Sequence, residues 1–282
     1  MICPRRDAAG AGWLQDQEGV GGVTRFSANL GLLWRELDLP VAIHQAARAG
    51  FDAVECHWPY ATPAREVAAA LADTGLFMIG INTSAGNRDA GEFGLAALPG
   101  REVEACAAIE EAVRYAEAIG AEVVHVMAGC AAGDDAEEVF CKNLDHAARL
   151  AAGAGLTVLI EPLNPRDVPG YFLDGTARAE RVISAVGAPN LKLMFDCYHL
   201  ALMEGELEPL LKKYWHRIGH IQFAGVPDRG HPDRGDIDYP ALFRHLEGLG
   251  YTAPLGAEYH PDGGDTDASL DWLDAFRKAR SS

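Results

Sequence analysis

The sequence lacks several features that would each point to a particular class of protein. No apolar run approaches the roughly 18 residues of a membrane-spanning helix. The six cysteines form no CxxC pair and no zinc-type cluster, which is typical of a protein of the reducing cytoplasm. Positive charge is also scarce: 24 Lys and Arg face 41 Asp and Glu, giving a formal net charge of −17. This excess argues against a nucleic-acid partner, whose phosphates need cations, but it does not forbid a small anionic substrate.

The first 22 residues, MICPRRDAAGAGWLQDQEGVGG, contain no apolar core stretch and are therefore not expected to be a secretory signal. They are rich in glycine and show no periodicity. A transit peptide is a weaker interpretation, because Asp7, Asp16 and Glu18 count against it. We expect residues 1–22 to be a flexible extension and residues 23–282 to form one catalytic domain, for which 49% apolar residues supply a large core.

One pattern recurs from Thr24 onward: a short apolar run, a polar loop, an amphipathic stretch and then the next apolar run. There are eight such runs: TRFSAN (24–29), DAVE (52–55), FMIGIN (77–82), EVVHVM (122–127), TVLIE (157–161), LKLMFD (191–196), GHIQF (219–223) and LGAE (255–258). The stretches between these runs contain residues that are typical of the beginnings and ends of helices. Thr62 and Pro63 are expected to open one helix, and Gly50, Gly75 and Gly120 to end three. Later helices are expected to begin at Thr176, Glu206, Tyr239 and Thr266.

Strands that alternate with helices predict parallel pairing and right-handed crossovers. Eight such units close most economically into a single α/β domain, a (β/α)₈ TIM barrel with parallel strands. The alternative is an open doubly wound sheet. That fold usually carries a glycine-rich GxGxxG turn after its first strand, and ANLGLLW has none.

The active site of a (β/α)₈ barrel lies at the carboxyl ends of its strands. Six of the predicted strands stop at or beside a polar residue: Glu55, Asn82, Glu161, Asp196, Gln222 and Glu258. Carboxylates that converge in one mouth would raise one another's pKa values unless a cation relieved the repulsion. We therefore predict a Mg²⁺ or Mn²⁺ site formed by the oxygens of Glu161, Asp196, Gln222 and Glu258, because zinc would prefer more His and Cys.

Single residues carry less information than this set. Glu55 taken alone is more simply the polar start of a loop. His125, in the middle of a predicted strand, is interpreted as a core histidine with satisfied hydrogen bonds. The set Glu161, Asp196, Gln222 and Glu258 is different, because chance rarely places such residues at the ends of four successive predicted strands.

The segments that carry these residues resemble the hydroxypyruvate isomerase family of the xylose isomerase-like barrel superfamily. The matching segments include RFSANLGLLW, IEPLNPRDVPGYFL, FDCYHLALMEGEL, GHIQFAGVPDRGHPDRGDIDYPALF and GAEYHP, and the resemblance spans about residues 24–277. It implies the same four metal ligands that the strand ends indicate. Two departures, His231 in place of a usual Glu and His260 in place of a usual Lys, concern the choice of substrate.

The resemblance further implies conversion of hydroxypyruvate to 2-hydroxy-3-oxopropanoate, with Glu161 and Glu258 as the acid/base pair and His199 and Arg229 at the substrate. Arg229, or Arg88 in the loop after the third strand, is expected to bind the substrate carboxylate. Glu55 is included among the candidate substrate contacts.

Three other functions stay open from the sequence. They are a 2-oxo-tetronate isomerase or ketose 3-epimerase with the same chemistry, a metal-dependent endonuclease, and a binding barrel without catalysis. The negative charge disfavours the nuclease, and the presence of both glutamates disfavours the binding barrel. The expected partner is a small hydroxy or oxo acid, with no membrane. The sequence allows, without requiring, a homo-oligomer.

Overall fold

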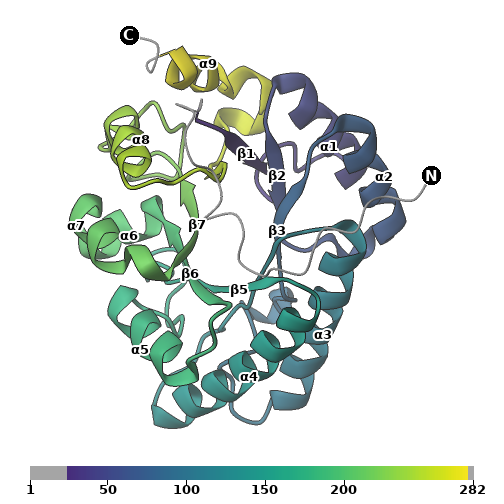
Figure 1. The fold of residues 1–282 in the computed structure, drawn as a ribbon, viewed down its shortest axis with the longest axis vertical. Coiled ribbons are helices and arrows are strands. Elements are labelled where there is room, and N and C mark those ends of the chain that lie inside the picture. The colour runs from purple at the N-terminus through teal and green to yellow at the C-terminus, as the bar shows by residue number, and fades with distance from the viewer. Residues whose placement is uncertain (1–23, 279–282) are drawn as a thin grey trace.

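A computed structural model describes residues 24–278, and they form a closed barrel of eight strands surrounded by helices (Figure 1). The strands are β1 (Phe26–Asn29), β2 (Ala53–Cys56), β3 (Met78–Asn82), β4 (Val123–His125), β5 (Thr157–Ile160), β6 (Leu191–Asp196), β7 (Ile218–Phe223) and β8 (Leu255–Ala257). Each is parallel to the next, and β8 pairs with β1 to close the ring. The predicted (β/α)₈ barrel is confirmed and the open doubly wound sheet is wrong. The predicted extension, residues 1–22, lies outside the described residues.

The helices follow the strands in chain order. They are α1 (Leu39–Ala49), α2 (Ala64–Thr74), α3 (Glu102–Ile119), α4 (Asp134–Gly153), α5 (Thr176–Val186), α6 (Cys197–Glu204), α7 (Leu207–Tyr214), α8 (Tyr239–Gly248) and α9 (Asp271–Lys278). The expected stops at Gly50 and Gly120 are present, because both residues adopt the left-handed conformation (φ 88° and 68°) that ends a helix. Among residues 24–278, no helix is long and apolar enough to cross a membrane.

Helix α6 was not predicted from the sequence, because the first helix after the sixth strand was expected to begin at Glu206. Helix α6 begins directly after β6, and Asp196 is its N-cap, since its Oδ1 accepts a hydrogen bond from the Tyr198 amide at 2.7 Å. The periodicity failed here because the segment is apolar on all sides and its first turn is buried, so it shows no polar face. The second helix, α7, has Glu206 at its N-cap.

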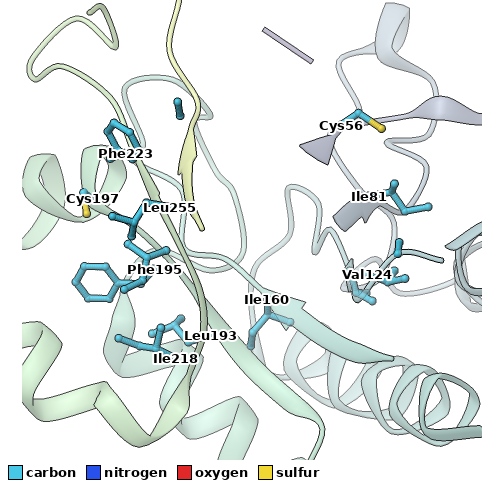
Figure 2. Packing of buried hydrophobic residues seen from close by; sticks show 14 of the residues in the cluster. Cys56, Ile81, Val124, Ile160, Leu193, Phe195, Cys197, Ile218, Phe223 and Leu255 are labelled. Carbon is cyan, nitrogen blue, oxygen red and sulfur yellow. The ribbon is translucent and has the colours of Figure 1, made fainter. Parts of the chain in front are cut away.

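Two layers of apolar packing hold the barrel. Side chains that point inward fill its lower interior: Ala53, Ile79, Val123, Leu159 and Met194. Alternate residues of the same strands point outward and pack under the helices, and Figure 2 shows Ile160, Leu193, Phe195 and Phe223 in this outer layer. Because the pleat alternates, the residue two positions beyond an interior apolar residue faces the interior again, one layer higher.

Candidate active site

This alternation places polar side chains above the apolar floor of the barrel. Two positions beyond Ala53, Leu159 and Met194 stand Glu55, Glu161 and Asp196. Gln222 of β7 is the register partner of Asp196 of β6, so these two side chains are neighbours. Glu258 follows β8 directly, and all four of the predicted ligands are buried.

Three of the predicted ligands carry an oxygen without a hydrogen-bond partner. These buried atoms are Glu161 Oε1, Asp196 Oδ2 and Gln222 Oε1. An unsatisfied buried polar group costs about 1–3 kcal/mol, and three such oxygens on or directly after neighbouring strands fit the ligands of a cation. Ligand atoms of Glu161, Asp196 and His199 lie within 4.8 Å of one another. The first two belong to the predicted ligand set, whereas His199 is a predicted substrate contact. Carboxylate and amide oxygens fit a hard divalent cation such as Mg²⁺ or Mn²⁺.

The Gln222 amide is held by Glu55. Its Nε2 donates a hydrogen bond to Glu55 Oε2 at 2.7 Å, and its carbonyl oxygen is the unpartnered atom. Glu55 also accepts a hydrogen bond from Ser27 Oγ at 2.6 Å and lies 3.2 Å from His220 Nε2. Both oxygens of Glu55 therefore face protein donors. Its predicted contact with substrate stays a prediction, and the contacts favour a supporting role.

Glu258 is bound by two cationic or potentially cationic side chains. His57 Nε2 lies 2.7 Å from Glu258 Oε1, and Arg229 Nη2 lies 3.2 Å from the same oxygen. Arg229 Nη2 is also 3.7 Å from Asp196 Oδ2. His57 was not among the residues predicted from the sequence. It lies one residue beyond β2, and only the fold brings it to a residue 201 positions away.

The two glutamates experience opposite electrostatic environments. Burial, followed by the charges of Glu258 and Asp196, raises the pKa of Glu161 well above its usual value. Burial acts in the same direction on Glu258, but Arg229 and the His57 hydrogen bond outweigh it and lower the pKa of Glu258 to about 2. A pair of carboxyl groups with separated pKa values is what acid/base chemistry requires.

Two buried histidines border the carboxylates. His199 Nδ1 accepts hydrogen bonds from the Asn164 amide at 3.0 Å and from Asn164 Nδ2 at 2.8 Å, so the proton of the neutral ring is on Nε2. That Nε2 lies 3.8 Å from Asp196 Oδ2. Burial, supported by Arg229, lowers the pKa of His199 to about 3. His199 is thus a neutral donor at the site, as a substrate contact would need to be.

His125 is buried, as its interpretation as a core residue predicts, but the expected satisfied hydrogen bonding is wrong. Its Nδ1 lies 3.6 Å from Glu161 Oε2, and its buried Nε2 has no hydrogen-bond partner. Burial lowers the pKa of His125 to about 4, so the ring is neutral at pH 7. The register explains the position: His125 is two residues beyond Val123 and therefore points inward at the level of the carboxylates.

The two candidate arginines lie in different surroundings. Arg229 is largely buried, its Cζ lies 5.3 Å from the Tyr198 ring centroid, and its backbone has a positive φ of 58°. Arg88 is exposed, and its Cζ stacks 4.4 Å from the Trp58 ring centroid. Within residues 24–278, Arg88 makes no ion pair with the four predicted ligands. Of the two arginines, only Arg229 therefore lies beside these ligands.

The two departures from the family pattern also have defined places. His231 Nε2 accepts a hydrogen bond from the Asp262 amide at 3.3 Å, and its ring packs 5.6 Å from that of Tyr259. The His260 amide donates to the carbonyl oxygen of Arg229 at 2.8 Å. Both residues therefore support the loop that holds Arg229.

Known proteins resemble this chain in sequence and in fold. A sequence model of the xylose isomerase-like TIM barrel family matches residues 43–276. The chain belongs to this family. Similar proteins include the 2-oxo-tetronate isomerase of Cupriavidus necator, which is 45% identical over 89% of this chain and 98% of its own. The hydroxypyruvate isomerase of Escherichia coli K12 is 39% identical over 90% of this chain and 99% of its own.

A solved crystal structure has the same fold. The protein is named AP endonuclease, family 2, and comes from Brucella melitensis. It superposes with a TM-score of 0.86 at 38% identity, covering 90% of this chain and 99% of its own. The resemblance to hydroxypyruvate isomerases that the motifs indicated is confirmed by the curated relatives.

Proposed function

We propose that the protein is a sugar-acid isomerase that interconverts hydroxypyruvate and 2-hydroxy-3-oxopropanoate. The observation that carries this proposal is the position of Glu161 and Glu258, which are buried directly after β5 and β8 in one mouth, with Asp196 and Arg229 beside them. Such a pair can take a proton from one carbon and return a proton to its neighbour. The names of the relatives support the same class of reaction.

We further propose that Glu161, Asp196, Gln222 and Glu258 hold a Mg²⁺ or Mn²⁺ ion. When bound, such an ion would stabilise negative charge on the substrate oxygens while the C–H bond next to the carbonyl is broken. The unpartnered oxygens of Glu161, Asp196 and Gln222 support three of these four ligands.

Side chains of the protein would carry out the proton transfers and bind the substrate. One glutamate removes the proton from C3, and the other delivers a proton to C2, which moves the carbonyl from C2 to C3. Arg229 would bind the substrate carboxylate, because its guanidinium lies beside Asp196 and Glu258 and offers paired donors. His199, neutral and with Nε2 protonated, would donate to the oxygen that becomes a hydroxyl. No nicotinamide is required, since hydrogen moves as a proton.

A second substrate, 2-oxo-tetronate, is supported by the relative from Cupriavidus necator. It differs from hydroxypyruvate by one additional carbon and needs the same proton transfer. A nuclease function is suggested by the name of the Brucella melitensis protein. We do not favour it, because a net charge of −17 would repel a nucleic acid. We propose a cytoplasmic location on the cysteine pattern alone.

The test is a proton NMR assay of the Mn²⁺-loaded enzyme with hydroxypyruvate, 2-oxo-tetronate and a panel of ketoses. We expect conversion of one or both acids and much slower conversion of neutral ketoses, which lack the carboxylate that Arg229 would bind. Conversion of the ketoses alone would contradict the proposal, as would no conversion of any compound.

A further inference from the structure

The Gln222 side chain can present either its oxygen or its nitrogen to the mouth, and only the oxygen can bind a cation. We infer that Glu55 is a positioning residue, which makes the oxygen of the Gln222 amide face the mouth. The Glu55 carboxylate thus affects cation binding without contacting the cation. The inference rests on the metal site in the proposed function.

The hydrogen bonds of Glu55 determine how the amide faces. A carboxylate only accepts hydrogen bonds, so the group that faces Glu55 Oε2 must be the Gln222 NH₂, 2.7 Å away. The other Glu55 oxygen receives Ser27 Oγ at 2.6 Å, and His220 Nε2 approaches both oxygens at 3.2 and 3.3 Å. Rotating the amide by half a turn would set its carbonyl oxygen against the carboxylate, two acceptors with no hydrogen between them.

Gly256 of β8 provides the space for this arrangement. It is the register partner of Gln222. A Cβ atom on Gly256 would lie 2.3 Å from Glu55 Oε1, 2.8 Å from Gln222 Cγ and 3.0 Å from His220 Nε2. Any other residue at this position would therefore displace the network. Because Gly256 has no side chain, there is space beside β8 for the Glu55 side chain to reach Gln222.

The hydrogen bond also has an electronic consequence. A charged acceptor on the NH₂ side of an amide draws positive charge toward itself and increases the negative charge on the carbonyl oxygen. Glu55 would thereby make Gln222 Oε1 a better ligand as well as a correctly oriented one. Residues that orient metal ligands in this way typically change metal affinity by about 10–100-fold when they are altered.

The experiment is calorimetric titration of Mn²⁺ into the wild-type protein and four variants, with the melting temperature of each recorded beside it. Glu55→Gln keeps the shape but removes the acceptor-only group, and Glu55→Leu leaves the amide without an acceptor. Ser27→Ala is the matched control, because it removes a donor to the other Glu55 oxygen and leaves the amide contact intact. Gln222→Leu measures the loss of Mn²⁺ affinity that is expected when the ligand itself is absent.

We expect both Glu55 variants to bind Mn²⁺ about 10-fold or more weakly, with Gln222→Leu at least as weak and Ser27→Ala at the wild-type affinity. A purely structural role would lower the melting temperature without changing the affinity. Wild-type affinity in both folded Glu55 variants would overturn the inference, as would a wild-type protein that binds no Mn²⁺. The assay contains no substrate, so failure to isomerise sugar acids would overturn the proposed reaction and leave this inference standing.

Discussion

His57 Nε2 lies 2.7 Å from Glu258 Oε1 and holds that carboxylate in place. The His57 ring fits only because residue 31 is glycine: a Cβ there would lie 2.3 Å from His57 Nδ1. We expect His57→Ala to lower kcat by about 100-fold, because small errors in the position of a reacting group have effects of this size. Steady-state kinetics would measure it, with His44→Ala, on the outer helix α1, as the control. Equal kcat values in the two variants would show that His57 does not position Glu258.

The acid/base pair predicts two variants with nearly the wild-type shape. Glu161→Gln and Glu258→Gln should each lower kcat by about 10²–10⁴-fold while the fold persists, since neither amide can exchange protons at neutral pH. Circular dichroism and metal analysis must accompany the kinetics, because loss of the ion would lower activity by another route. A near-wild-type rate in either variant would remove that residue from the proposed chemistry.

The carboxylate cluster predicts that Mn²⁺ stabilises the protein. Glu161 and Asp196 are buried beside each other, and burial raises the pKa of both groups. A ligand at 100 times its Kd adds about 2.7 kcal/mol to the free energy of unfolding, which for a domain of this size raises the Tm by about 5 °C or more. Thermal scans of EDTA-treated protein with and without Mn²⁺ would measure this shift. A shift of the same size in Asp196→Asn would place the ion elsewhere.

The two arginines predict a contrast in KM. Arg229→Ala should raise KM for hydroxypyruvate about 10-fold or more, because a charge-assisted hydrogen bond contributes about 1.5–3 kcal/mol. Arg88→Ala, which removes an exposed side chain stacked on Trp58, should have a smaller effect. The comparison needs only initial rates over a range of substrate concentrations. A larger rise in Arg88→Ala would assign the carboxylate to the loop after β3.

The sequence predicts the barrel and most of the cluster because both depend on local periodicity. Alternation along a strand places Glu161 and Asp196 at the mouth as soon as the strand is recognised, and Gln222 follows from the same argument. The contacts of His57 with Glu258, and of Ser27 with Glu55, could not be predicted in this way. His57 and Glu258 are 201 positions apart, and Ser27 and Glu55 lie on the neighbouring strands β1 and β2. Both contacts use space left by glycines, Gly31 beside His57 and Gly256 beside Glu55, which no periodicity reveals.

Helix α6 and His125 show the limits of the same reasoning. A helix buried at its start has no polar face to mark it, so Cys197–Glu204 was not predicted. A histidine within a strand resembles a core residue until the register places it beside a carboxylate, as it places His125 beside Glu161.

The most direct test of proton transfer between two glutamates is the fate of hydrogen in D₂O. Mn²⁺-loaded enzyme would be given hydroxypyruvate in D₂O, and the product would be examined by proton NMR. The proton returned to C2 would come from a glutamate that exchanges with solvent, so we predict deuterium at C2 and hydrogen at the aldehyde carbon. A product that carries the original hydrogen at C2 would show transfer of that same hydrogen between the carbons, as a hydride or on a single base shielded from solvent, and would contradict transfer through two glutamates.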